Sequence, residues 1–548
     1  MTESAFFNHS KKIIEDFLST AIIFDDQAYF GDFNPDPPKD VVSPAKRKTA
    51  SQKKEDKNTK EIENKGTEDI LKPSHDLNAK MVINSFAKKG ILCSVIKPEE
   101  QELETLHETV ASLSQKSDLI IFDWELSQES GKTALGLVKE SMKIFNDSSP
   151  QQLRLIAIYT GATDINRVFS QIIEELKNEY SVKNVDDRCC QIGACRLLVF
   201  SKKAAKTADD VNKIAFEDLA DFLIDEYTKM TKGLVSNVVM KSFSAIKQNT
   251  HQIINKFSGL DHPFLTHRTC LPKPEEAENQ IATLISEEIQ SLLEEYGVGN
   301  SSNFEVLKLY FQNQPNDKYY SLNKLKKDKC LTKQQVLYLL EHGIPSENEN
   351  RPPILSTEVL NKKELKKLFQ FLTNMYSDSD DENLLDLKYA ALTTLKSKYS
   401  DNFPYLTLGT IVKDMSGEEG YWICIQPGCD SVRLTKDTSF PFLPLSQKGD
   451  IHCVIRDSSE SLTRKKISLK FSDCRKSTFS PDPTSKNIIA FKNENDFFFK
   501  NTKENVFKFI CEMKPGYAQR LSNKFAANIS RVATNNSEWL RRCEEKKL

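Results

Sequence analysis

Acidic residues stand directly after short apolar runs in the first part of the chain, where a carboxylate could bind a metal or act as a nucleophile. The run IIF is followed by Asp25 and Asp26, and the run LIIF is followed by Asp123. Each run is too short for a helix core and is bounded by charge, which predicts parallel strands buried on both faces. Ligands bind at the carboxyl ends of such strands in open α/β sheets. These three carboxylates are therefore the first candidates for a functional site.

Two later apolar runs end in a hydroxyl group and in ammonium groups. LIAIY is followed by Thr160, and LLVFS is followed by Lys202 and Lys203. If these strands lie beside those that carry the acids, all of the side chains meet at one rim of the sheet. Three carboxylates so close together repel one another unless a hard divalent cation lies among them, and Mg²⁺ is the expected ion.

This set of groups predicts phosphoryl-transfer chemistry. One carboxylate can attack a phosphoryl group while the metal and the lysine neutralise its oxygens and the Thr160 hydroxyl donates a hydrogen bond to one of them. The product would be an acyl phosphate on Asp123.

The elements that must position these groups follow the pattern of a doubly wound sheet. Amphipathic helices separate five strand-like runs, which predicts a five-stranded parallel sheet covered on both faces. We expect the helix before the second strand to be capped by Asp76 and to end at Gly90. The five predicted strands are TAIIFDD (20–26), GILCSVI (90–96), DLIIFD (118–123), LRLIAIYTG (153–161) and CRLLVFSKK (195–203).

The rest of the 548-residue chain changes character twice, which predicts three domains. Residues 1–232 form the α/β domain, with a disordered insertion at about 31–74 that is rich in Pro, Lys, Ser and Glu. Residues 233–400 show helical periodicity and predict a mostly α-helical domain. Residues 401–548 predict a β-rich barrel or sandwich with a C-terminal helix, on which Leu521, Phe525, Ile529 and Val532 share a face.

The composition is that of a soluble protein. Apolar residues make up 39% of the chain, charged residues 28%, and the net charge is -2, so any partner must be recognised locally. No apolar run reaches the roughly 18 residues that a membrane span needs, and we expect a cytoplasmic location without membrane contact. The 12 cysteines show no regular spacing, which favours reduced thiols over a disulfide framework.

The runs IIFDD, IIFDWELSQESG, IAIYTG and LLVFSKK together resemble the receiver domain of bacterial two-component response regulators, the CheY-like fold. The resemblance covers about residues 18–230 without the insertion, and it includes Gly131 at the usual distance after the aspartate. It implies that Asp25 and Asp26 bind Mg²⁺ together with Asp123, the phosphoacceptor. It also implies that Thr160 is the switch hydroxyl, that Lys203 contacts the phosphoryl group, and that Phe200 is the aromatic residue that changes rotamer on activation.

The chain departs from the family pattern at several positions. Ala204 replaces the proline that commonly follows the lysine, and Lys202 takes the role of Lys203 if the register differs by one residue. Ser127 stands where proline is frequent, and the insertion follows Gln27 beside the metal site. A degenerate receiver that serves as a docking platform therefore remains an alternative. A haloacid-dehalogenase-type phosphatase fits less well, because it needs a second aspartate two residues after the first.

Other residues could carry chemistry but have a simpler structural interpretation. Zinc ligands or a cysteine nucleophile could come from Cys424, Cys429, His452 and Cys453, but the spacing is poor for zinc and favours buried cysteines in a hairpin. We interpret His262, His267 and Arg268 as an interhelix turn beside Pro263. The segment at 189–196, which begins CCQIGAC, is interpreted as a loop and strand entry rather than a redox pair.

The basic residues of the last part of the chain are interpreted as a solvated face rather than a nucleic-acid site. These residues are Arg520, Lys524, Arg531, Arg541 and Arg542.

The pattern as a whole predicts an atypical response regulator that accepts a phosphoryl group on Asp123 from a histidine kinase or kinase-like ATPase. Its expected output is a change in protein–protein interaction, in a bacterial stress or antiphage signalling system. We expect no enzymatic activity beyond the phosphoacceptor chemistry. The alternatives are a phosphorylation-independent pseudo-receiver scaffold, and an effector enzyme or nucleic-acid-binding module in the C-terminal half.

Overall fold

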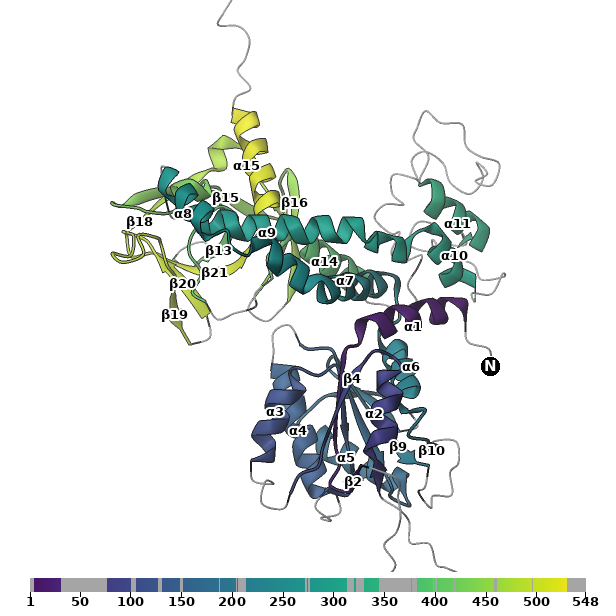
Figure 1. The fold of residues 1–548 in the computed structure, drawn as a ribbon. Coiled ribbons are helices and arrows are strands. Elements are labelled where there is room, and N and C mark those ends of the chain that lie inside the picture. Colours follow the sequence, from purple (N-terminus) through teal and green to yellow (C-terminus); the bar gives the residue numbers. More distant parts are fainter. Residues whose placement is uncertain are drawn as a thin grey trace, which may run out of the picture. The chain divides into compact units, whose positions relative to one another are not determined.

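The computed structural model divides the chain into two compact units, Met1–Pro315 and Asn316–Leu548, each described here by itself (Figure 1). The structure describes residues 4–30, 76–99, 105–126, 131–147, 151–186, 188–203, 205, 213–271, 274, 276–312, 320–321, 330–343, 376, 382–397, 399, 402–416, 420–457, 461–494 and 496–529. The predicted insertion at 31–74 lies outside these residues, as does the position of Ser127.

The five predicted parallel strands are present and are neighbours in one sheet, in the order β4-β1-β5-β6-β9. Their register places Phe24 beside Phe122, Phe122 beside Ile158, and Thr160 beside Ser201. The carboxyl ends of four strands therefore lie next to one another along the sheet. The strands are β1 (Thr20–Phe24), β4 (Leu92–Ile96), β5 (Leu119–Phe122), β6 (Arg154–Thr160) and β9 (Cys195–Lys202).

Strands that the sequence did not predict extend this sheet to eight strands. A hairpin of β7 (Val182–Asp186) and β8 (Cys189–Ile192) adds to the first part of β9 in antiparallel fashion. The short β10 (Lys213–Ile214) pairs in parallel with the last two residues of β9. The expectation that residues 189–192 form a loop is therefore wrong. In a separate pair, β2 (Ala28–Tyr29) lies parallel to β3 (Leu77–Asn78).

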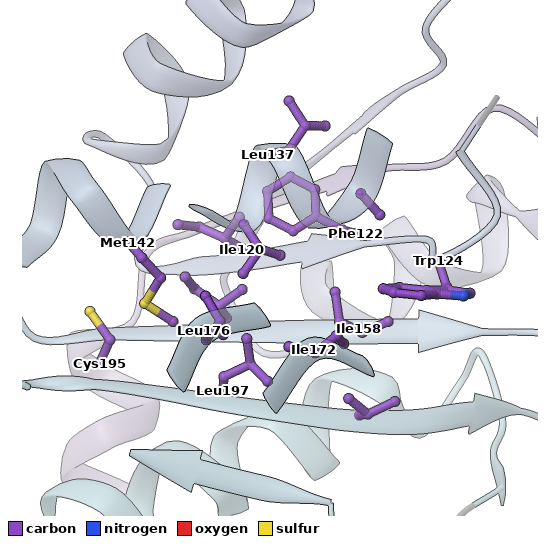
Figure 2. Packing of buried hydrophobic residues seen from close by; sticks show 14 of the residues in the cluster. Ile120, Phe122, Trp124, Leu137, Met142, Ile158, Ile172, Leu176, Cys195 and Leu197 are labelled. Carbon is purple, nitrogen blue, oxygen red and sulfur yellow. The ribbon is translucent and has the colours of Figure 1, made fainter. Parts of the chain in front are cut away.

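Helices cover both faces of the sheet, which confirms the doubly wound architecture. One face carries Ile120, Phe122 and Ile158 and packs against α3, α4 and α5, as Figure 2 shows for α4 and α5. The other face carries Ile121, Tyr159 and Phe200 and packs against α1, α2 and α6. These helices are α1 (Ala5–Phe17), α2 (Ala79–Ala87), α3 (Leu106–Ser114), α4 (Lys132–Asp147), α5 (Ile165–Lys177) and α6 (Leu219–Thr231).

The residue that caps the start of α2 differs from the expected one, whereas the glycine expected after the end of the helix is in place. The side chain that caps the helix is Asn78, whose Oδ1 accepts a hydrogen bond from Met81 N at 3.1 Å, and not Asp76. Gly90 has φ +74°, a backbone conformation that glycine adopts without strain, and it separates the helix from β4.

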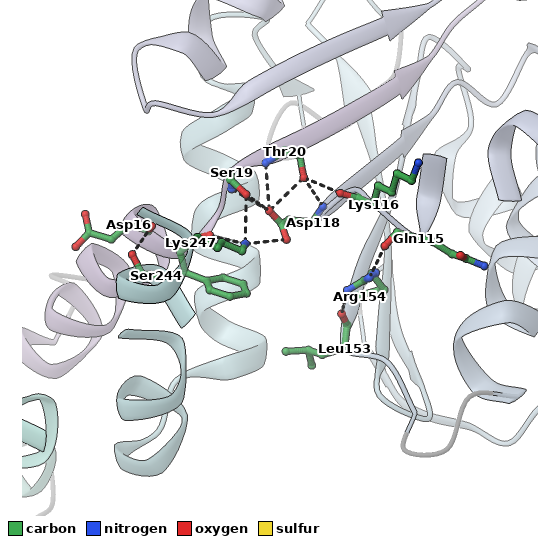
Figure 3. Close-up of polar contacts among 11 residues, drawn as sticks. Asp16, Ser19, Thr20, Gln115, Lys116, Asp118, Leu153, Arg154, Ser244 and Lys247 are labelled. Carbon is green, nitrogen blue, oxygen red and sulfur yellow. Dashed lines mark hydrogen bonds and ion pairs between the residues drawn. The ribbon is translucent and has the colours of Figure 1, made fainter. Parts of the chain in front are cut away.

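The first unit continues beyond the sheet as a set of helices. Helix α7 runs beside α1, where Ser244 Oγ donates a hydrogen bond to the carbonyl oxygen of Asp16 at 2.8 Å. At the amino ends of β1 and β5, Lys247 Nζ of α7 lies 3.5 Å from Asp118 Oδ1 (Figure 3). The remaining elements of this unit are α7 (Leu234–Phe257), α8 (Asp261–Cys270), α9 (Glu276–Glu295), η3 (Val298–Ser302) and α10 (Phe304–Gln312).

The second unit contains a nine-stranded antiparallel sheet, in the order β16-β17-β15-β14-β13-β21-β20-β19 with β18 paired to β15. Two hydrophobic clusters lie on it, and one of them includes Leu521 and Phe525 of the final helix, as expected from the sequence. Its strands are β13 (Thr410–Asp414), β14 (Tyr421–Cys424), β15 (Thr438–Ser446), β16 (Ile451–Arg456), β17 (Leu462–Ile467), β18 (Arg475–Phe479), β19 (Phe491–Asn493), β20 (Asp496–Lys500) and β21 (Val506–Glu512).

The other elements that the structure describes in this unit are helical or very short. They are β11 (Tyr320–Ser321), β12 (Cys330–Leu331), α11 (Lys333–His342), α14 (Glu382–Thr394), η4 (Gly428–Asp430), η5 (Phe471–Asp473) and α15 (Pro515–Ile529). The segment at 428–433 is a short 3-10 turn followed by bends. In the described part of the chain, no helix has both the length and the apolar character that crossing a bilayer requires.

Candidate functional site

Three aspartates come together at the carboxyl ends of β1 and β5. Each strand is extended by one further backbone hydrogen bond, from Asp25 N to the Ile96 oxygen at 3.0 Å and from Asp123 N to the Phe24 oxygen at 2.9 Å. Asp25 and Asp123 thereby keep the register of the sheet at the point where the buried apolar run stops. One carboxylate oxygen from each of Asp25, Asp26 and Asp123 lies within 4.8 Å of the others.

The lysine that reaches these carboxylates is Lys202, and the choice of Lys203 is wrong. Lys202 Nζ lies 2.7 Å from Asp25 Oδ2 and 3.4 Å from Asp123 Oδ1, and its side chain is fully buried. Lys203 is exposed to solvent. Because successive residues of a strand point in opposite directions, a shift of one residue decides which of two adjacent lysines enters the site.

Burial and mutual repulsion shift the pKa values of the site. Burial, with the neighbouring charge of Asp25, raises the pKa of Asp123 to about 7, although the ammonium of Lys202 opposes the rise. Burial also raises the pKa of Asp25, and again Lys202 acts in the opposite direction. Burial alone would lower the pKa of Lys202, but the carboxylates of Asp123 and Asp25 raise it above its usual value. The site therefore holds more acidic groups than one lysine can neutralise.

The donor atoms of the site fit a hard divalent cation. Neither oxygen of Asp123 accepts a hydrogen bond from any residue that the structure describes, and Lys202 contacts this carboxylate only at ion-pair distance. Buried carboxylates without donors are costly, and Mg²⁺ takes carboxylate oxygens together with water and phosphate oxygens. Asp25, Asp26 and Asp123 are thus a suitable set of ligands for such an ion.

Thr160 lies at the same rim, at the last position of β6. Because Phe122 is level with Ile158, Asp123 is level with Tyr159, and Thr160 extends one residue beyond it. Its side chain is fully buried, and its Oγ1 accepts a hydrogen bond from Ala162 N at 3.1 Å. This contact holds the first turn of the loop that connects β6 to α5.

Phe200 lies on the opposite face of the sheet from Thr160, which corrects the expected pair of switch residues. Its ring centroid lies 5.0 Å from that of Tyr159 and 4.7 Å from that of Phe222, in the core beneath α2 and α6. Tyr159 and Thr160 alternate along β6, so the Thr160 side chain points to the α4 and α5 face. The structure therefore does not bring Phe200 and Thr160 together.

Gly131 and Trp124 shape the segment that follows Asp123. Gly131 has φ +86°, and a Cβ atom at this position would lie only 2.0 Å from Cε2 of Trp124. The Trp124 side chain is buried in the core seen in Figure 2. The sequence singled out Gly131, but it did not indicate that the Trp124 side chain leaves no room for a Cβ atom at this position.

The cysteines singled out in the second unit are not brought together as metal ligands. Cys424 and Cys453 belong to different hydrophobic clusters, and Cys429 is exposed. Burial raises the pKa of both Cys424 and Cys453 to about 12, which keeps these two thiols protonated and unreactive. The Sγ atom of the exposed Cys429 lies 3.4 Å from Asp430 Oδ1.

The histidines expected in a turn lie instead on a helix. His262, His267 and Arg268 all belong to α8, where His267 contacts Gln280 and Arg268 pairs with Glu278 of α9. His262 and His267 are exposed and Arg268 is half-buried. On α15, Arg520 and Lys524 are also exposed, while Arg531, Arg541 and Arg542 lie outside the described residues.

Comparison with known proteins identifies the domain that carries the aspartate site. Residues 17–207 match the family model of the response receiver domain. Neither the comparison with curated proteins nor that with solved structures gave a match. The matched range includes all three aspartates, Thr160 and Lys202.

Proposed function

Residues 17–207 form a receiver domain, and from this premise we propose that Asp123 accepts a phosphoryl group from a histidine kinase or a kinase-like ATPase. The observation that carries the proposal is the state of the Asp123 carboxylate. It is buried, accepts no hydrogen bond from a described residue, and lies beside two further aspartates and a buried ammonium group. Such a carboxylate is available for covalent chemistry, whereas a structural one would be satisfied by backbone donors.

Phosphoryl transfer at this site is a displacement at phosphorus. An Asp123 oxygen forms the new P–O bond while the bond between phosphorus and the donor's leaving group breaks, and the leaving group departs with the electron pair. A Mg²⁺ ion held by Asp25, Asp26 and Asp123 would supply positive charge for the phosphoryl oxygens. Lys202, already 3.4 Å from Asp123, would pair with one of these oxygens. The Thr160 hydroxyl would donate a hydrogen bond to another.

The proposed role of the phosphorylation is to change which proteins the chain binds. The contact between Thr160 and Ala162 N would be exchanged for a contact with the phosphoryl group, and this would move the loop between β6 and α5. A loop with two such arrangements is an element whose equilibrium a covalent modification can bias. The receiver part, residues 1–232, would thus act as the switch for the helical part, 233–400, and the β-rich part, 401–548.

The proposal places the protein in the cytoplasm. The cysteines whose side chains the structure describes are free thiols, which fits a reducing compartment.

The test is phosphorylation by a small donor. Wild type, Asp123→Asn and Glu175→Gln are incubated with Mg²⁺ and acetyl phosphate, and a hydroxylamine-sensitive phosphoprotein is measured by mass. Glu175→Gln is the matched control, because it makes the same carboxylate-to-amide change on the exposed surface of α5. We expect label in wild type and in the control but not in Asp123→Asn.

Two results would overturn the proposal. One is equal labelling of Asp123→Asn. The other is a wild-type protein that takes up no label and whose unfolding temperature does not respond to Mg²⁺ with beryllofluoride, an analogue of the phosphoryl group. After the second result, the receiver domain would be a docking scaffold that works without phosphorylation.

A further inference from the structure

Ser201 lies beside Thr160 at the rim of the sheet, one residue before Lys202. The two hydroxyl residues are direct partners in the parallel register of β6 and β9. Neighbouring strands are about 5 Å apart and partner side chains point to the same face. Ile158 and Val199, two residues earlier on each strand, pack in the same hydrophobic cluster, which places Thr160 and Ser201 together on the face toward α4 and α5.

The Ser201 hydroxyl is buried and unsatisfied. Its residue is fully buried, and no group in the described part of the chain forms a hydrogen bond with Ser201 Oγ. A buried hydroxyl without a partner destabilises the folded state, so this serine is unfavourable in the arrangement seen here. Thr160 Oγ1, its neighbour, accepts a hydrogen bond from Ala162 N and has a second lone pair that could accept another.

Among the described residues 197–202 of β9, Ser201 has the only polar side chain on the face of Thr160. On this face the preceding residue is Val199, which has no donor, and Phe200 points into the opposite core. The Lys202 ammonium is held by Asp25 at 2.7 Å. If the hydrogen bonding of Thr160 changes, Ser201 is therefore the residue of β9 whose side chain can form a new hydrogen bond with it.

We propose that Ser201 is a positioning residue for the phosphorylated state, and this inference rests on the function proposed above. When the Thr160 hydroxyl turns to donate a hydrogen bond to the phosphoryl group on Asp123, Thr160 Oγ1 accepts a hydrogen bond from the Ser201 hydroxyl. The result is a chain from Ser201 through Thr160 to the phosphoryl oxygen, in which each bond strengthens the next. The unsatisfied hydroxyl of the unphosphorylated protein thus favours the switched arrangement.

The test is a double-mutant cycle on the affinity for beryllofluoride in the presence of Mg²⁺. Wild type, Ser201→Ala, Thr160→Ala and the double variant are compared by titration calorimetry, and the unliganded proteins by chemical unfolding. We expect Ser201→Ala to weaken beryllofluoride binding about three- to tenfold, the range of one hydrogen bond, and to leave the unliganded protein as stable or more stable. In the Thr160→Ala background the Ser201 substitution should have no further effect.

Ser141→Ala is the matched control. Ser141 on α4 is another fully buried serine whose hydroxyl has no hydrogen-bond partner among the described residues. This variant should not change beryllofluoride binding, whatever it does to stability.

The outcomes separate the two proposals. If wild type binds beryllofluoride and Ser201→Ala binds it equally well, or weakens it by the same factor with and without Thr160, the role of Ser201 is refuted while the receiver function stands. If wild type does not bind beryllofluoride at all, the proposed function fails, and the role of Ser201 fails with it.

Discussion

Lys202 Nζ lies 2.7 Å from Asp25 Oδ2, and neither side chain is more than 1% exposed. The pair therefore exists without competition from solvent, in a place where an isolated charge would be expensive. The same carboxylate is one of the proposed metal ligands, so Lys202 and a bound cation share Asp25. When a cation neutralises part of the negative charge of Asp25, we expect the Lys202 ammonium to leave this ion pair and to turn toward an incoming phosphoryl group.

The two adjacent lysines provide a matched pair of variants. Lys202→Met should destabilise the protein by about 3 to 5 kcal/mol, because it leaves two buried carboxylates without their cation. Lys203→Met should leave stability within about 0.5 kcal/mol, because Lys203 is exposed. Urea unfolding without Mg²⁺ measures both differences. Equal losses from the two variants would contradict the assignment of Lys202 to the site.

Asp123 should make stability depend on pH. Its pKa is about 7 in the folded protein and near 3.8 in the unfolded chain, so the folded state binds more protons between these values. The contribution of Asp123 to stability is therefore most favourable below about pH 4 and is lost as the pH rises through about 7. Asp123→Asn should gain stability relative to wild type between pH 5 and pH 8. A constant difference over this range would mean that Asp123 does not have a raised pKa.

The same protonation should control metal binding. A cation binds the ionised carboxylate, so Mg²⁺ must compete with the proton on Asp123 as the pH falls through about 7. Mg²⁺ should raise the unfolding temperature more at pH 8 than at pH 6. This difference should disappear in Asp123→Asn. A Mg²⁺ effect that is independent of pH in wild type would show that the ion binds elsewhere.

Gly131 and Gly136 test the close approach of the backbone to Trp124. Gly131→Ala should cost about 1 to 3 kcal/mol, because it adds a Cβ 2.0 Å from the indole at a positive φ. Gly136→Ala lies in α4, where the new Cβ meets only His107 Cε1 at 3.5 Å, and it should stabilise the helix by about 0.5 to 1 kcal/mol. Unfolding and tryptophan fluorescence distinguish the two. A neutral Gly131→Ala would mean that Trp124 moves without cost.

Asp118 contacts both the start of β1 and Lys247 of α7, and these contacts should differ in how much they stabilise the protein (Figure 3). Asp118 Oδ2 accepts hydrogen bonds from Ser19 N at 2.9 Å and from Thr20 N at 3.1 Å. Asp118→Ala should therefore cost about 2 to 3 kcal/mol, because it leaves these donors unpaired. Lys247→Met should cost about 1 kcal/mol or less, since its ammonium is partly exposed. Chemical unfolding measures both, and a larger loss from Lys247→Met would reverse this ranking.

Much of the α/β domain could be predicted from short stretches of the chain. Runs such as LIIF can only be buried on both faces of a sheet, and their order with intervening amphipathic segments leaves a doubly wound fold as the simplest arrangement. The acids that follow these runs must then meet at the carboxyl ends of the strands. For this reason the positions of Asp25, Asp123 and Thr160 followed from local patterns alone.

Other features depended on contacts between distant residues. The choice between Lys202 and Lys203 and the face taken by Phe200 depend on a single residue of register, which β9 acquires only by pairing with β6, β8 and β10. The hairpin of β7 and β8 is held by the antiparallel pairing of β8 with β9, and the sequence of the hairpin alone does not predict strands.

The sequence by itself therefore determined which strands end in residues that can act chemically, because a short apolar run is enough to identify a buried strand. Only the tertiary structure decided which neighbouring side chains enter the site, because the direction of a side chain is set by hydrogen-bond register between strands far apart in the chain.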